Sequence, residues 1–162
     1  MFIGRDREMA SLDKLYSSGK FEFAVVYGRR RVGKTALINQ FIQDKRAIYF
    51  MGVESNDKQN LENFSRNILE YGLGIQAETA FLSFQAALEY VFKLAQHERL
   101  ILAIDEYPYV AQSYKSLASI LQLLIDQPPP GGGSGPAGCS CSGWPSPLTA
   151  MPFRVPRQSN ER

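Results

Sequence analysis

Three short apolar runs divide the chain. They cover residues 21–27 (FEFAVVY), 47–53 (AIYFMGV) and 100–104 (LILAI). Runs that are this short and nearly continuously apolar are typical of strands buried on both faces of a parallel sheet. The pattern therefore predicts three strands of such a sheet.

Apolar residues recur at helical spacing in the segments around these runs. The recurring positions are Met9, Leu12 and Leu15, then Leu37, Ile38, Phe41 and Ile42, then Leu61, Phe64, Ile68 and Leu69, then Phe84, Leu88, Val91, Phe92 and Ala95, and finally Leu117, Ile120, Leu121, Leu124 and Ile125. An alternation of strands and helices produces crossover units. We therefore expect an α/β fold with helices flanking a parallel sheet.

The composition of the chain changes after Gln127. Residues 128–162 contain eight of the nine prolines, six of the 13 glycines and both cysteines. A segment so rich in proline and glycine, with no hydrophobic period, is typical of disorder. The sequence therefore predicts one ordered domain, residues 1–127, followed by a disordered C-terminal tail, residues 128–162.

Charge and apolar run length exclude several classes of protein. Residues 1–127 hold 15 Lys and Arg against 15 Asp and Glu, so the formal net charge of +2 lies in the tail, and the neutral body disfavours a nucleic-acid surface. No run approaches the roughly 20 apolar residues of a membrane span, and the N-terminus lacks a signal-peptide core, so we expect a cytoplasmic protein. Cys139 and Cys141 have the wrong spacing for paired zinc ligands.

A loop that contains glycine follows the first predicted strand and precedes a predicted helix. Its sequence GRRRVGKT, residues 28–35, fits the pattern G-x-x-x-x-G-K-[ST] of a phosphate-binding loop. Gly28 and Gly33 permit backbone angles and a close approach of phosphate that a Cβ would forbid. Strand, loop and helix stand in the order that this motif requires, so we interpret the segment as a phosphate-binding loop.

The residue types of this loop suit ATP with magnesium. Backbone N–H groups of residues 31–36 can point at phosphate oxygens, and the helix N-terminus adds partial positive charge. The Lys34 ammonium can reach the β- and γ-phosphates, and the Thr35 hydroxyl can coordinate Mg²⁺. The predicted nucleotide-binding residues are Gly28, Arg31, Val32, Gly33, Lys34, Thr35 and Ala36. Arg29 and Arg30 are interpreted as solvated side chains that attract polyphosphate at long range.

Two acids follow the third apolar run. Asp105 would lie at the carboxyl end of that strand, beside the loop, and bind Mg²⁺ through water. Glu106 is placed where a carboxylate can polarise the water that attacks the γ-phosphate. The alternative is an ordinary strand-end turn with acids and Pro108. Together with the loop, the acid pair predicts ATP hydrolysis, with Glu106 and Lys34 as catalytic residues and Thr35 and Asp105 as metal ligands.

The segments FIGRDREMASLDKLY, VVYGRRRVGKTALI, AIYF and LILAIDEYPYV together resemble the archaeal-type AAA family ATPases, which are P-loop NTPases related to the STAND signalling ATPases. The resemblance covers residues 1 to about 127 and implies an AAA/ASCE-type parallel sheet. It also implies that Phe2, Ile3, Gly4 and Arg5 lie against the adenine. The residues alone indicate a helix start with acidic side chains near its N-terminus.

The chain departs from the family after its last predicted helix. The family sheet has the strand order 5-1-4-3-2, and only strands 1, 2 and 3 are predicted here, so the domain is expected to be truncated after the strand of Asp105. If Ser140 and Ser142 have TCN codons, the next reading frame encodes alternating apolar residues. A frameshifted tail is therefore one hypothesis, beside a natural short protein or a sequence-assembly error.

Three functions remain open from the sequence. The first is ATP binding and Mg²⁺-dependent ATP hydrolysis, with an unidentified protein or a second copy of the chain as partner. The second is a nucleotide-binding switch or interaction module without useful turnover, or a truncated fragment without function. The third is a nucleic-acid-binding fragment that uses residues 29–31, and the neutral body disfavours it.

Overall fold

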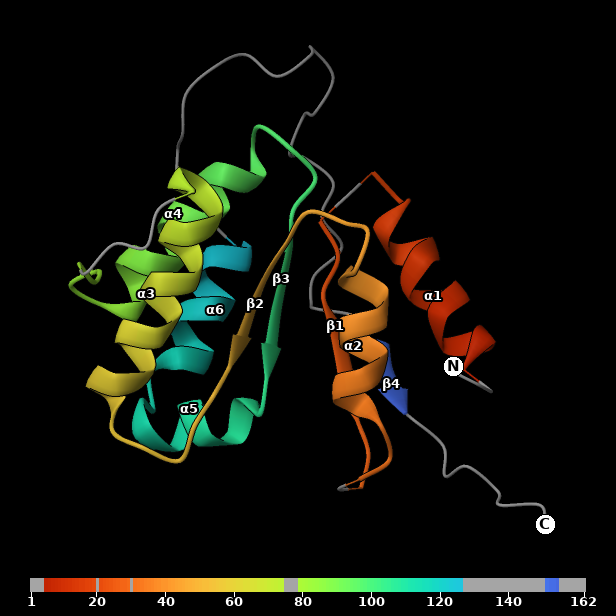
Figure 1. The fold of residues 1–162 in the computed structure, drawn as a ribbon, viewed down its shortest axis with the longest axis horizontal. Helices are drawn as coiled ribbons and strands as arrows, with labels where there is room; N and C mark the ends of the chain where they lie inside the picture. Colours follow the sequence, from red (N-terminus) through yellow and green to blue (C-terminus); the bar gives the residue numbers. More distant parts are fainter. Residues whose placement is uncertain (1–4, 20, 30, 75–78, 127–150, 155–162) are drawn as a thin grey trace. The chain divides into compact units, whose positions relative to one another are not determined.

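The structure is a computed structural model that describes residues 5–19, 21–29, 31–74, 79–126 and 151–154. The chain forms two compact units. The first contains the described residues of Met1–Asp44 and Gly135–Arg162, and the second contains those of Lys45–Ser134. Each unit combines helices with a pair of parallel strands, so the mixed α/β character predicted from the sequence is confirmed (Figure 1).

Among its described residues, the first unit has two helices and two strands. They are α1 (Asp6–Tyr16), β1 (Ala24–Tyr27), α2 (Lys34–Ile42) and β4 (Met151–Arg154). The helices pack through the apolar positions that predicted them: Leu12 of α1 is buried, as are Leu37 and Phe41 of α2. The ring of Tyr16 meets that of Phe41 edge-on, with 6.3 Å between the centroids. This packing holds α2, which follows the candidate loop, against α1.

Strand β4 pairs in parallel with β1, in a register that sets Ala24 opposite Met151 and Tyr27 opposite Arg154. It lies within the segment that composition predicts to be disordered, so that prediction is wrong for these four residues. The physical reason is that an extended segment pairs with a strand edge through its backbone N–H and C=O groups, whatever its side chains, and only the N–H of Pro152 is missing. The rest of the tail lies outside the described residues, and the division at residue 127 stays a prediction.

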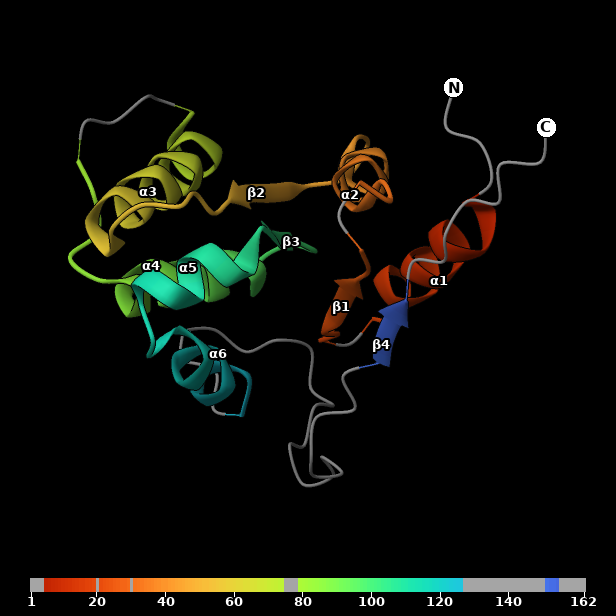
Figure 2. The ribbon, with the colours of Figure 1, turned by 90° about the horizontal axis from the view of Figure 1, so that it is seen from below.

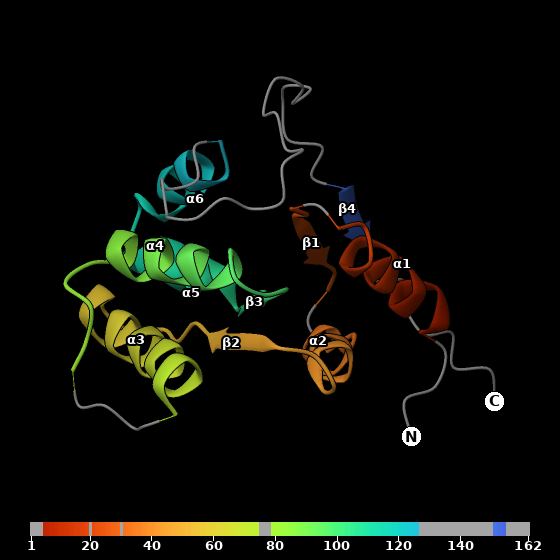
Figure 3. The ribbon, with the colours of Figure 1, turned by 90° about the horizontal axis from the view of Figure 1, so that it is seen from above.

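In the part that the structure describes, the second unit has four helices and two strands. They are β2 (Ala47–Met51), α3 (Asp57–Leu73), α4 (Phe84–Ala95), β3 (Ile101–Asp105), α5 (Tyr107–Ser113) and α6 (Leu117–Asp126). Strands β2 and β3 run parallel, from Ala47 opposite Ile101 to Met51 opposite Asp105. Helices α3 and α4 lie on one side of this pair in all three views (Figure 1, Figure 2 and Figure 3). None of the helices described is long and apolar enough to cross a membrane.

The core of the second unit lies between the β2–β3 pair and these helices. Ile48 and Phe50 enter it from β2, each with 1% of its surface exposed. The Phe50 ring contacts Phe64 with 4.9 Å between centroids, and Phe64 stacks on Phe84 at 6.1 Å. The other buried core residues are Ile68, Ala87, Leu88, Val91, Val110, Leu117 and Leu124. Burial of each large side chain contributes about 1.5–3 kcal/mol, and this core holds β3 against its helices.

The continuous apolar runs predict strands that are buried on both faces, and this prediction is wrong for β1 and β2. On β2, Tyr49 is half-buried and Met51 is exposed. On β1, Val25 and Tyr27 are exposed. The reason is that helices cover one face of the β2–β3 pair, and within the described residues β1 pairs with β4 alone.

The hydrophobic periodicity does not predict helix α5, and Pro108 enters the sequence analysis only in the alternative of a strand-end turn. In the structure Pro108 occupies the first turn of α5, where a helix does not need its N–H and where its fixed φ is favourable. Other helix starts have side-chain caps: Asn56 accepts from the N–H of Gln59 at 2.8 Å in α3, and Ser83 caps α4. The helix α5 therefore begins directly after the acid pair.

Candidate functional site

The loop between β1 and α2, residues 28–33, passes through left-handed backbone twice. The φ angle is 65° at Arg31 and 84° at Gly33. A Cβ built on Gly33 would meet no atom within 4 Å, so the backbone angle, rather than crowding, requires glycine there. An arginine at this angle is strained by roughly 1–2 kcal/mol, so surrounding contacts must hold the loop in this form. Arg30 lies outside the described residues.

Lys34 is the first residue of α2 and reaches back over the loop. Its Nζ donates hydrogen bonds to the carbonyl oxygens of Gly28 and Arg29, both at 3.1 Å. Gly33 caps the helix, and its carbonyl oxygen accepts from the N–H of Leu37 at 3.0 Å. The first N–H groups of α2 therefore point out of the N-terminal end of the helix, next to the loop. Those groups belong to the predicted residues Lys34, Thr35 and Ala36.

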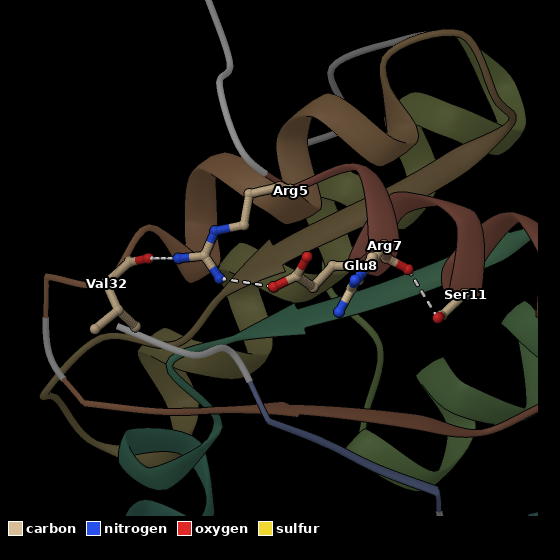
Figure 4. Close-up of polar contacts among 5 residues, drawn as sticks. All are labelled: Arg5, Arg7, Glu8, Ser11 and Val32. Carbon is tan, nitrogen blue, oxygen red and sulfur yellow. Dashed lines mark hydrogen bonds and ion pairs between the residues drawn. The ribbon is translucent and has the colours of Figure 1, made fainter. Parts of the chain in front are cut away.

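Arg5 joins the same unit from the segment before α1. It occupies the N-cap position, and only 3% of its surface is exposed. Its Nη1 forms an ion pair with Oε1 of Glu8 at 3.2 Å, and its Nη2 donates to the carbonyl oxygen of Val32 (Figure 4). The structure thus brings Arg5 and the predicted loop residues together. The other residues predicted to contact adenine, Phe2, Ile3 and Gly4, lie outside the described residues.

Asp105 ends β3, as the apolar run predicts, and is 5% exposed. Its Oδ2 accepts from the Tyr49 hydroxyl at 3.0 Å, and its Oδ1 accepts from the N–H of Glu106 at 2.9 Å. Its backbone carbonyl accepts from the N–H of Gly52 at 2.9 Å. These bonds fix both the position and the direction of the carboxylate.

Glu106 has a different environment from its neighbour. It holds φ at 50° and ψ at 37° at the start of α5, and its side chain is exposed. Its carbonyl oxygen accepts from the N–H of Tyr109 at 3.0 Å. Within the described part of the chain, the non-glycine residues with positive φ are Arg31 and Glu106. Strained backbone of this kind concentrates at functional sites, and both residues are ones that the motifs select.

Sequence reasoning misses Tyr49, which lies on β2 opposite Ala103 and so two pairs before Asp105, on the same face of the strand pair. Burial raises the pKa of Tyr49 most, and the hydrogen bond to Asp105 and the negative charges of Asp105 and Glu106 raise it further. A raised pKa keeps the hydroxyl protonated, which is the form that donates to the carboxylate. No local signal could have found Tyr49, because sequence alone does not show which strand lies beside the strand of the acid.

Gly52 is the second residue that sequence reasoning misses. A Cβ at this position would lie 2.4 Å from Cγ2 of Val110 and 2.8 Å from the carbonyl oxygen of Glu106. The absence of a side chain therefore allows the segment after β2 to approach the turn that carries the acids. A glycine at the end of an apolar run is the signal that could have found it.

The predicted residues divide between the two units. The first unit holds Arg5, the loop and Lys34, and the second holds Asp105, Glu106 and the residues that contact them. The described residues contain no group of three or more His, Cys, Asp or Glu side chains arranged to hold a metal ion.

Comparison with known proteins bears on most of the chain. Residues 2–131 match the family described as an ATPase domain predominantly from Archaea. The chain belongs to this family. Its ATPase domain spans the β1–α2 loop as well as the acid pair, so both motifs lie inside the matched segment.

Two relatives of this ATPase domain come from Methanocaldococcus jannaschii. An uncharacterized protein is 30% identical over 126 residues, which is 78% of this chain and 26% of that protein. An uncharacterized ATP-binding protein is 41% identical over 46 residues, which is 28% of this chain and 78% of that protein. The match therefore spans about a quarter of the length of the first relative. No solved structure matches the chain.

Replacement of Gly52 by alanine tests the close contact at the acid turn. The new Cβ would overlap Val110 and the Glu106 carbonyl, so we expect Gly52→Ala to lower the free energy of unfolding by roughly 1–3 kcal/mol. Gly72→Ala is the control, since its Cβ would meet Tyr90 Oη at 3.3 Å, and it should change that free energy by less than about 1 kcal/mol. Urea denaturation measures both, and equal effects would contradict the contact.

The raised pKa of Tyr49 predicts a loss of stability in alkali. The unfolded chain releases this phenolic proton near pH 10, before the folded chain does, so the stabilisation is complete below about pH 10 and falls as the pH rises further. Tyr49→Phe removes this titration, so its free energy of unfolding should fall less steeply above pH 10. Tyr27→Phe, at an exposed position, should keep the wild-type slope. Parallel slopes for all three proteins would exclude the proposed environment of Tyr49.

Proposed function

We propose that this chain binds ATP, with residues 28–36 as its phosphate-binding loop. The observation that carries the proposal is the backbone of the loop, which has left-handed residues at Arg31 and Gly33 within the G-x-x-x-x-G-K-T spacing. Membership of a family of ATPase domains supports it, as does the ATP-binding name of one relative.

The loop can hold a triphosphate through its backbone and one lysine. Successive N–H groups that flank left-handed residues form a concavity for anionic oxygens, and the N-terminus of α2 adds partial positive charge. The Lys34 ammonium now contacts two neutral carbonyl oxygens. Charged phosphate oxygens attract an ammonium more strongly than neutral oxygens do, so we propose that Lys34 transfers to the β- and γ-phosphates when ATP binds.

Mg²⁺-dependent hydrolysis of ATP is the further part of this proposal. The Thr35 hydroxyl and the Asp105 carboxylate are hard oxygen donors of the kind that Mg²⁺ accepts, and the ion retains several waters. A carboxylate has about four lone-pair sites, so the bonds from Tyr49 and Glu106 orient Asp105 and are compatible with metal coordination. When bound, Mg²⁺ neutralises charge on the phosphate oxygens. Glu106, whose side chain is exposed, would take the proton of the attacking water.

ATP binding without turnover is the second candidate. The sequence supports it, because only strands 1, 2 and 3 of the family sheet are predicted within residues 1–127. In this form the chain would act as a nucleotide-binding switch. The adenine contact that the family resemblance implies for Phe2, Ile3, Gly4 and Arg5 is compatible with either candidate, as is a protein partner or a second copy of the chain.

Replacement of Lys34 tests nucleotide binding directly. Lys34→Ala removes the charged donor, so the affinity for ATP should fall roughly 10- to 100-fold, the scale of a charge-assisted hydrogen bond. Lys14→Ala, which removes an exposed lysine of α1, should leave the affinity unchanged. Isothermal titration calorimetry with both variants gives the comparison. Unchanged ATP affinity in Lys34→Ala would exclude the phosphate-binding loop.

The acid pair separates metal binding from chemistry. Glu106→Gln should keep the affinity for Mg-ATP and lower the hydrolysis rate by roughly 10²–10⁴-fold, because it keeps the shape and loses the base. Asp105→Asn should weaken Mg-ATP binding and leave ATP binding in EDTA unchanged. Glu54→Gln, at an exposed site in the same unit, is the control. Equal effects of the two acid substitutions on Mg-ATP affinity would contradict these roles, and no turnover in the wild type would favour the switch.

A further inference from the structure

Arg5 is the only lysine or arginine that is buried within the described part of the chain. A buried guanidinium is unfavourable unless it is paired and its N–H groups are bonded. Glu8, one helical turn further on and also buried, provides the opposite charge. Arg7, between them in sequence, is exposed instead.

The ion pair uses only one arm of the guanidinium. The other arm, through Nη2, donates to the carbonyl oxygen of Val32, which is 27 residues away in the sequence (Figure 4). The planar fork of arginine can make both contacts at once, whereas a lysine ammonium is a single point of charge. Arg5 therefore joins the start of α1 to the middle of the loop.

Val32 lies between the two left-handed residues of the loop, Arg31 and Gly33. In a trans peptide the C=O of one residue and the N–H of the next point in opposite directions. A donor that fixes the Val32 carbonyl oxygen on one side of the loop therefore fixes the Gly33 N–H toward the other side. Without that donor, the peptide between Val32 and Gly33 can rotate about ψ of Val32 and φ of Gly33, and glycine restricts this rotation least.

We propose that Arg5, held by Glu8, is a positioning residue that orients the Gly33 N–H toward a phosphate group of the bound nucleotide. The inference rests on the proposed ATP binding and adds a residue to it from outside the loop. It assigns Arg5 a role in phosphate affinity, in contrast to the adenine contact that the family resemblance implies. Glu8 shares the role, because it keeps the guanidinium in place.

Tripolyphosphate distinguishes the two roles of Arg5, since it has the phosphates of ATP and no adenine. The test variant is Arg5→Lys, which keeps the charge and loses the fork, and Arg7→Lys is the matched control on the same helix. Leu12→Val loosens the packing of α1 without a change at the loop. Glu8→Gln provides a second test if circular dichroism shows that Arg5→Lys does not fold.

Calorimetry should show that Arg5→Lys lowers the affinity for ATP and the affinity for tripolyphosphate by the same factor, about tenfold. Arg7→Lys and Leu12→Val should change neither affinity. In the wild type, the ¹⁵N–¹H resonance of Gly33 should move when tripolyphosphate binds, and this movement should shrink in Arg5→Lys. Glu8→Gln should also lower the affinities for ATP and for tripolyphosphate by one common factor.

Three results would overturn the inference. Loss of affinity for ATP alone would assign Arg5 to adenine, and unchanged affinity for both ligands would leave it no part in binding. Equal loss in Leu12→Val would show that Arg5 only anchors α1. The proposed function fails separately, if the wild type binds neither ligand. If Lys34→Ala weakens both ligands and Arg5→Lys weakens neither, the proposed function stands and the inference fails.

Discussion

A strand that runs directly into a helix must change direction within a few residues, and the chain does this twice by means of left-handed backbone. Arg31 and Gly33 make the turn between β1 and α2, and Glu106 makes the turn between β3 and α5. A non-glycine residue in this region costs roughly 1–2 kcal/mol, so each turn needs contacts that hold it. Lys34 and Arg5 bind carbonyl oxygens of the first turn.

The second turn is held differently, and the difference separates the two acids. Asp105 is buried and takes hydrogen bonds at both carboxylate oxygens, so its direction is fixed before any ligand arrives. Glu106 keeps an exposed side chain on a strained backbone. A fixed carboxylate suits the coordination of a metal ion, and a solvent-exposed one is accessible to water. Gly52 supports both by leaving room for the turn.

Local patterns predict those parts of the fold and the site that depend on neighbours in sequence. The loop, its helix and the acid at the end of β3 are of this kind, since glycine angles and strand length are local properties. Tyr49 and the contact of Arg5 with Val32 depend on which segments meet in space, which periodicity does not reveal. The exposed face of β1 escapes prediction for the same reason, because burial depends on what covers a strand.

Hydrogen–deuterium exchange of the whole chain, with and without saturating Mg-ATP, tests most directly whether the left-handed loop is a nucleotide site. Amides that bind phosphate oxygens are withdrawn from solvent, so exchange in residues 31–36 should slow by about tenfold or more. The core helix α4 (Phe84–Ala95) serves as the internal reference and should change far less. Unchanged exchange across residues 31–36 at saturating Mg-ATP would contradict the proposal that this loop binds the nucleotide.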